Sequence, residues 1–122
     1  GSQLMPLYRA QKTDLFLGAW GPDYNDPHTN AQPFADHTAK QIAYRNAYEN
    51  EQTAKMIQDA GQEMDDAKRI AMYQAVNKII QEEGPFAFLY QRLYLHAVRN
   101  NVQDLKVGPN PQLTKFYTVT KK

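Results

Sequence analysis

A stiffened stretch of aromatic and acidic residues, Trp20–Pro27, imposes the strongest constraint on how this chain folds. It follows an apolar run at residues 15–19, so the pattern predicts a loop that leaves the end of a buried strand. Two prolines restrict φ, and Gly21 allows a sharp turn. Rigid loops at strand ends are where α/β proteins place binding groups. The same residue types also make ordinary turns with a tryptophan in the core, and both interpretations stay open on the chemistry alone.

Three further segments have the patterns of strands. Residues 86–90 are apolar on both alternating faces, like residues 15–19, which is typical of a parallel sheet covered on both sides. Residues 93–98 alternate more clearly and are expected to form a third strand, and residues 116–119 are a candidate edge strand. The two doubly apolar runs are therefore predicted to be neighbouring or near-neighbouring strands of an α/β fold.

Two helices are predicted between these strands. Glu49–Ala60 is expected to be helical, with Asn50 as the N-cap and Gly61 as the residue that ends the helix. Asp65–Glu83 is the stronger prediction, because its apolar residues recur on one face and Gly84-Pro85 stops it. The members of this stripe are Met72, Tyr73, Val76, Ile79 and Ile80. We expect the stripe to lie in the core and to cover the strands.

Composition excludes several classes of function. The chain has 122 residues and a formal net charge of +1 without a basic block, so it suits one domain and nucleic acid is not an expected partner. It has no cysteine, and its one serine is Ser2, which leaves no thiol or serine nucleophile. No apolar run approaches the roughly 18 residues that a membrane span needs. His28, His37 and His96 match no metal-ligand spacing, so we expect two loop histidines, one strand histidine and no metal site.

Four sequence elements occur in an order that is more informative than any one of them. The stretch at residues 20–27 reads Trp-x-x-Asp-Tyr-x-Asp-Pro, and residues 44–46 read Tyr-Arg-Asn. Asp65, Arg69 and Tyr73 then share a helix that ends in Glu-Glu-Gly-Pro, and an apolar run closes on Tyr90. This order resembles the C-terminal portion of the extracytoplasmic solute-binding proteins of the oligopeptide/dipeptide/nickel ABC-importer family, over about residues 7–122.

The resemblance implies an α/β fold that is a fragment of a two-lobed periplasmic-binding-protein-like fold of type II, comprising part of the C-terminal lobe and a crossover segment. Residues 1–91 would belong to the second lobe and carry a ligand-facing loop at residues 20–34. Residues 92–122 would form the crossover segment that returns toward the first lobe. Gly1 and Ser2 are typical of a cloning remnant, so we expect the native N-terminus to be absent.

The resemblance also implies a ligand site without catalytic residues, metal ligands or cofactors. In peptide-binding members, the carboxylate three residues after the tryptophan pairs with the α-amino group of the ligand, and that position is Asp23. Trp20 would line the pocket, with Tyr24 and Asn25 beside it and Tyr90 near the crossover between lobes. No arginine lies just before Trp20, where Phe16, Leu17 and Ala19 stand instead, so the ligand class stays open among peptides, nickel chelates, sugars and opines.

The expected partners are a small-molecule or peptide ligand, an ABC permease, and either a missing N-terminal part or a second copy of the chain. The location implied is periplasmic or extracytoplasmic, associated with the membrane through the transporter or a lipid anchor. Two alternatives from other classes remain. One is a small α/β hydrolytic enzyme that uses Asp23 and Asp26 as acid and base, and the other is a non-catalytic interaction module.

Overall fold

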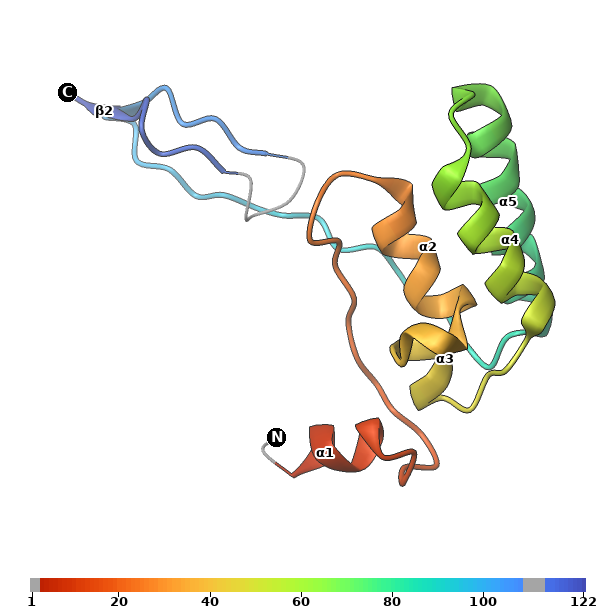
Figure 1. The fold of residues 1–122 in the computed structure, drawn as a ribbon. Coiled ribbons are helices and arrows are strands. Elements are labelled where there is room, and N and C mark those ends of the chain that lie inside the picture. The colour runs from red at the N-terminus through yellow and green to blue at the C-terminus, as the bar shows by residue number, and fades with distance from the viewer. Residues whose placement is uncertain (1–2, 109–113) are drawn as a thin grey trace.

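Three helices form the compact part of the molecule in the computed structural model, which describes residues 3–108 and 114–122 (Figure 1). These are α2 (Pro27–Ala35), α4 (Glu51–Gln62) and α5 (Asp66–Glu83), here called the helical bundle. The buried core cluster lies between them and consists of Ala31, Ala35, Ile57, Ala60, Tyr73, Val76 and Ile80. Every residue of this cluster is apolar or aromatic, and all of them come from these three helices, so the bundle has its own hydrophobic core.

Three short helical segments flank the bundle. The 3₁₀ helix η1 (His37–Ala39) and helix α3 (Ile42–Arg45) connect α2 to α4, and α1 (Leu4–Arg9) lies at the N-terminal end (Figure 1). Helix α1 is held by Tyr8, whose ring stacks on Phe16 and whose hydroxyl accepts a hydrogen bond from Asn46. No helix in the described ranges is long and apolar enough to cross a membrane.

The two predicted long helices are confirmed, together with the predicted N-cap at Asn50, and Asp65 is found to be the N-cap of α5. The Asn50 side chain accepts a hydrogen bond from the Thr53 backbone N–H at 3.1 Å, and the Asp65 carboxylate accepts one from the Lys68 N–H at 2.8 Å. Each interaction satisfies one of the backbone donors left free at a helix start. The stripe on α5 is also confirmed in its central residues, because Tyr73, Val76 and Ile80 are buried.

The prediction that Gly61 ends its helix is wrong. Helix α4 continues through Gln62, and a Cβ atom added at Gly61 would lie only 2.9 Å from Cε1 of His28. The glycine is therefore required by the close approach of the His28 ring to α4 rather than by a turn of the backbone. The two functions of glycine, as a helix stop and as a close-approach residue, look the same in sequence.

The prediction of a loop over residues 20–34 is also wrong beyond residue 26. Helix α2 begins at Pro27, where a proline at the first helical position loses no hydrogen bond. Pro33 lies inside the helix and cannot donate to the Thr29 carbonyl, but Trp20 Nε1 donates to that carbonyl instead, at 3.2 Å. The indole therefore supplies the hydrogen bond that the internal proline removes. Pro33, which indicated a loop, is therefore accommodated inside helix α2 by the Trp20 side chain, which lies outside that helix.

The predicted strands at residues 15–19, 86–90 and 93–98 do not form strands. They run as irregular traces without sheet pairing (Figure 1), and the described residues contain one antiparallel pair, β1 (Val102–Gln103) with β2 (Thr120–Lys121). The predicted edge strand at 116–119 is thus displaced to β2. A strand that is apolar on both faces needs neighbours for its N–H and C=O groups, and the helical bundle offers none. The described residues form a mainly helical structure with a small two-stranded sheet, which is compatible with a fragment of a solute-binding protein but lacks the predicted strands between the helices.

Candidate functional site

The loop at residues 20–26 connects the extended N-terminal segment to helix α2, and its first residue is anchored to that helix. Besides the hydrogen bond from Trp20 to Thr29, the indole meets the Phe34 ring edge-on, with 6.2 Å between centroids. Trp20 is nevertheless 38% exposed, so part of its apolar face remains open to solvent. The Thr29 hydroxyl adds hydrogen bonds to the carbonyls of Tyr24 and Asp26. Helix α2 therefore holds the loop in place through the hydrogen bonds of Thr29.

The last residue of the loop, Asp26, is anchored by charge. Arg69 Nη2 donates to Asp26 Oδ1 at 2.8 Å and to Oδ2 at 3.0 Å, and the His28 backbone N–H donates to Oδ1 at 2.7 Å. The Asp26 and Arg69 side chains are only 29% and 22% exposed. The hydrogen bond from Arg69 holds the pKa of the Asp26 carboxyl below its usual value, and burial opposes that shift. Asp26 is therefore both the N-cap of α2 and one half of a partly buried ion pair.

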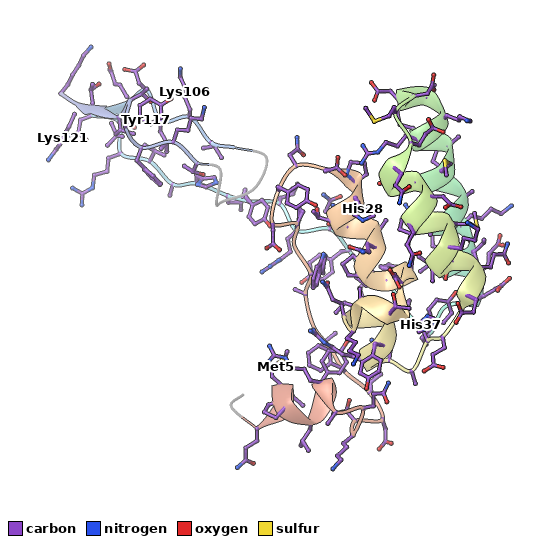
Figure 2. The ribbon with its side chains drawn as sticks, in the orientation of Figure 1. Met5, His28, His37, Lys106, Tyr117 and Lys121 are labelled. Atoms are coloured by element: carbon purple, nitrogen blue, oxygen red, sulfur yellow. The ribbon has the colours of Figure 1, made fainter. Side chains whose placement is uncertain are left out.

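This ion pair belongs to a cluster that joins the three helices, here called the junction: Asp26, His28, Arg69 and Tyr73. Arg69 also donates to the Tyr73 hydroxyl at 3.1 Å and to the Ala60 carbonyl of α4 at 3.3 Å. The Tyr73 hydroxyl is 3.0 Å from His28 Nδ1, with the donor set by the histidine tautomer. Figure 2 labels His28 on α2. Burial raises the pKa of Tyr73, although the Arg69 charge opposes this effect.

The sequence contained a signal for the junction but not its meaning. Arg69 and Tyr73 are four residues apart on a predicted helix, so they share one face. Nothing in that spacing shows that their partners are Asp26 and His28, which are more than forty positions away along the chain. The motif of Asp65, Arg69 and Tyr73 is thus resolved into one N-cap and two members of the junction.

The predicted ligand residues between the two anchors point into open space. Asp23, Tyr24 and Asn25 are exposed, and the Asp23 carboxylate forms no ion pair with any described residue. Tyr90, the fifth predicted residue, is 80% exposed on the segment after α5, and no hydrogen bond or ring contact joins it to the loop in the described ranges. The structure therefore brings four of the five predicted residues together, and it leaves Tyr90 apart from them.

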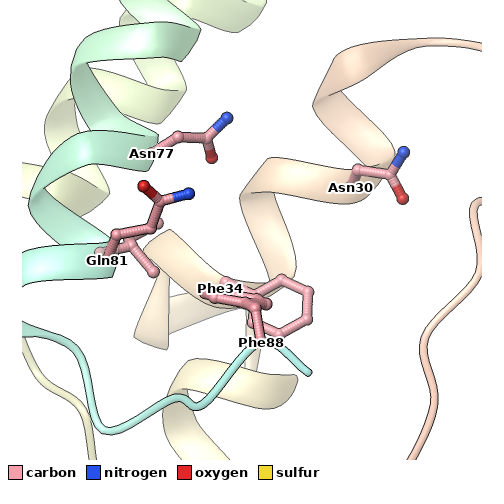
Figure 3. Close-up of a pocket in the computed structure, with 6 residues that line it drawn as sticks. Asn30, Phe34, Asn77, Gln81 and Phe88 are labelled. Atoms are coloured by element: carbon pink, nitrogen blue, oxygen red, sulfur yellow. The ribbon is translucent and has the colours of Figure 1, made fainter. Parts of the chain in front are cut away.

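A hollow of about 280 Å³ lies between α2 and α5 (Figure 3). Its lining residues are Asn30, Phe34, Asn77, Ile80, Gln81 and Phe88. Asn77 and Gln81 project from α5 and Asn30 comes from α2, so side-chain amides and aromatic rings form its walls. Phe34 connects the hollow to Trp20. Its walls carry no charged side chain and therefore suit neutral polar or apolar groups.

The histidines do not assemble into a common site. His28 lies on α2 and contacts Tyr73, so the prediction that it is a surface-loop residue is wrong. His37 belongs to η1, 3.4 Å from Glu51, and His96 is exposed on an irregular segment rather than a strand. Within the described ranges, no three residues of the types His, Cys, Asp and Glu are grouped so that they could hold a metal ion.

Comparison with known proteins gives one informative similarity. Over 107 residues the chain is 26% identical to the probable D,D-dipeptide-binding periplasmic protein DdpA of Escherichia coli (strain K12). The aligned part covers 87% of this chain and 20% of DdpA, so the chain spans about a fifth of the length of this curated relative. No family model matches the chain, and no solved structure matches it significantly. The chain is therefore similar to one segment of a probable D,D-dipeptide-binding periplasmic protein.

Proposed function

We propose that this chain is the part of a two-lobed ABC-importer binding protein that recognises the free α-amino group of a dipeptide-like ligand. The observation that carries the proposal is the different state of the two carboxylates of the loop. Asp26 is already paired with Arg69, whereas Asp23 is exposed without a counter-ion among the described residues. The similarity to DdpA supports the class of ligand, because a dipeptide carries one ammonium group.

The mechanism follows from the anchoring of the loop. Asp23 would accept the hydrogen bonds of the ligand ammonium, and the exposed face of Trp20 would contact an apolar part of the ligand. Tyr24 and Asn25 would form the rim. Closure of a second lobe over the loop would exclude water, which strengthens the charged hydrogen bond. Because the loop is already fixed at Trp20 and Asp26, it would lose little conformational entropy when the ligand binds.

The remaining parts of the chain receive their proposed roles from the resemblance. Residues 1–91 would belong to the ligand-facing lobe, and residues 92–122 would cross toward the other lobe, with Tyr90 at the passage between them. The intact protein would act outside the cytoplasm and deliver its ligand to an ABC permease. The alternative of an acid–base enzyme is less well supported, because Arg69 holds Asp26 and no free carboxylate pair remains on the loop.

The test is calorimetric titration of the full-length product of the gene that encodes this chain. D-alanyl-D-alanine and L-alanyl-L-alanine are compared with their N-acetylated forms, which lack the ammonium. Asp23→Asn is expected to weaken binding of the free dipeptide by roughly 2–5 kcal/mol, as for a truncated desolvated charge pair. Asp23→Ala is expected to cost more than Asp26→Ala.

The matched control is Asp14→Asn, which removes an exposed carboxylate outside the loop and should leave the affinity unchanged. Equal affinities for the parent protein and Asp23→Asn would refute the role of Asp23. Equal binding of free and acetylated dipeptides would refute recognition of the ammonium.

A further inference from the structure

We infer that Arg69 is the positioning residue of the ligand loop: through Asp26 it holds Asp23, Tyr24 and Asn25 at a fixed place relative to the helical bundle. The inference deepens the proposed function and rests on it for its biological meaning. Its structural part, the ordering of the loop by Arg69, stands on the geometry of the junction alone.

The first step in the argument is that Arg69 has more partners than helix packing requires. Its guanidinium reaches α2 through Asp26, α4 through the Ala60 carbonyl and its own helix through the Tyr73 hydroxyl. It also lies over the Tyr73 ring, with Cζ 5.0 Å from the centroid. A planar group with several donors in fixed directions can hold such a set of partners, and a lysine ammonium cannot do so in the same geometry.

The second step is that Asp26 passes this fixation on to the loop. Its backbone N–H donates to the Tyr24 carbonyl at 3.0 Å, and its own carbonyl accepts from Thr29. The other contacts of the segment are the Trp20 anchor and the hydrogen bond from the Thr29 hydroxyl to the Tyr24 carbonyl, and both lead to α2. When Asp26 loses Arg69, this end of the segment keeps its hydrogen bonds within α2 but loses its anchor to α5.

The third step separates the two functions of Asp26, which caps helix α2 and also connects the loop to Arg69. Asparagine is as good an N-cap as aspartate, so Asp26→Asn keeps the hydrogen bond to the His28 N–H and removes only the charge that binds Arg69. Arg69→Gln removes the same ion pair from the other side. If the ion pair positions the loop, both variants and their combination must have the same effect on it.

The experiment is ¹⁵N relaxation on the 122-residue chain, read at the amides of Asp23, Tyr24 and Asn25. In the parent chain these amides should have order parameters near 0.85, the value of rigid backbone, and in Arg69→Gln and Asp26→Asn they should fall below about 0.6. The double variant should fall no further than either single variant. The Trp20 indole N–H, which is anchored separately, should keep its order.

Two controls separate positioning from general stability. Lys68→Gln removes the neighbouring cation of α5, which is exposed and pairs with Glu63, and should leave the loop ordered. Arg69→Lys keeps the charge and should restore part of the order.

Acidification should loosen the parent loop as the Asp26 carboxyl becomes protonated, and it should have no such effect on Asp26→Asn.

A uniform loss of order along α2 without an excess at residues 23–25 would overturn the inference, and so would a loop that stays rigid in Arg69→Gln. In the full-length protein, Arg69→Gln should weaken binding of D-alanyl-D-alanine by about tenfold, because the loop must then be ordered on binding. If Arg69→Gln loosens the loop but no dipeptide binds even to the parent protein, the proposed function fails while the positioning of the loop by Arg69 stands.

Discussion

The helical bundle and the extended segments contain similar apolar side chains but bury them very differently. Ile57 and Val76 in the bundle are fully buried, whereas Leu93 and Leu95 after α5 are 86% and 91% exposed. The helices make their backbone hydrogen bonds within themselves, so a single apolar stripe per helix is enough to build a core. The extended segments need another strand for their backbone groups before they can bury anything. Folding of the bundle is thus local, and folding of the extended segments requires partners.

The strongest test of the difference between the two regions is to truncate one apolar side chain in each of them. Ile57→Ala should lower the free energy of unfolding by roughly 2–5 kcal/mol, because it leaves a cavity in a fully buried site. Leu95→Ala truncates a comparable side chain that is exposed to solvent, and it should change the free energy of unfolding by no more than about 0.5 kcal/mol. Urea denaturation followed by helical circular dichroism measures both values. Similar losses for the two variants would show that the exposed segment is packed in solution.

A smaller effect is expected where α2 approaches α4. Gly61→Ala would normally gain up to about 1 kcal/mol from helix propensity, but the new methyl group would clash with the His28 ring and cost about 1–3 kcal/mol. The matched control is Gly21→Ala, where no atom lies within 4 Å of the added Cβ. Thermal denaturation compares the two variants. A rise in melting temperature for Gly61→Ala would contradict the close approach.

Acid should weaken the bundle through its carboxylates. Hydrogen bonding by Arg69 lowers the pKa of Asp26, and at Asp36 burial raises the pKa but the hydrogen bonds from Thr38 and Gln58 more than offset it. Because the folded pKa values lie below the unfolded ones, their contribution to stability is complete above about pH 4 and is lost as the pH falls through the folded values. Melting temperatures between pH 7 and pH 2 should therefore fall most at the acid end.

The variants Asp26→Asn and Asp36→Asn serve as controls for this pH dependence. Each removes one titrating group and should flatten the acid limb of the curve while lowering the melting temperature at pH 7. An acid limb that keeps the slope of the parent chain in both variants would mean that other carboxylates cause the loss.

The smallest effect on stability, and a distinct effect on assembly, is expected in the extended segment. The exposed apolar residues after α5 should make the chain self-associate, so light scattering should give a dimer or larger species. Leu93→Lys should reduce this association and change the unfolding free energy by less than about 0.5 kcal/mol. Gln74→Lys on the exposed face of α5 adds the same charge elsewhere and should leave the association intact. A parent chain that stays monomeric at all concentrations would contradict the prediction.

Those parts of the fold that depend on nearby residues could be predicted from the sequence. The stripe on α5 and the cap at Asn50 depend on residues within a few positions, and both predictions are confirmed. Helix α2 was missed because Pro33 is tolerated only with the help of Trp20. The strands were predicted from their apolar residues, but an apolar pattern does not show whether a neighbouring strand is present to pair with them.

The candidate site shows the same division between local and distant information. A loop with two carboxylates was predicted from the sequence, but over residues 20–34, whereas in the structure it ends at residue 26. The difference between Asp23 and Asp26 was not, because it depends on Arg69, which lies 43 positions beyond Asp26. The spacing of Arg69 and Tyr73 indicated that both lie on one helical face, and only the fold shows what they bind.

The hydrogen bond from Trp20 to Thr29 has an evolutionary consequence. Since Pro33 withholds the donor that the Thr29 carbonyl would otherwise receive, the indole and the proline are functionally linked although they are 13 positions apart. A descendant sequence that exchanges Pro33 for alanine regains a backbone donor, and the Thr29 carbonyl no longer depends on the indole. One that exchanges Trp20 first leaves that carbonyl without a protein donor until Pro33 changes as well. The order of substitutions is therefore constrained by helix α2, and the proposed ligand contact is a second, separate constraint on position 20.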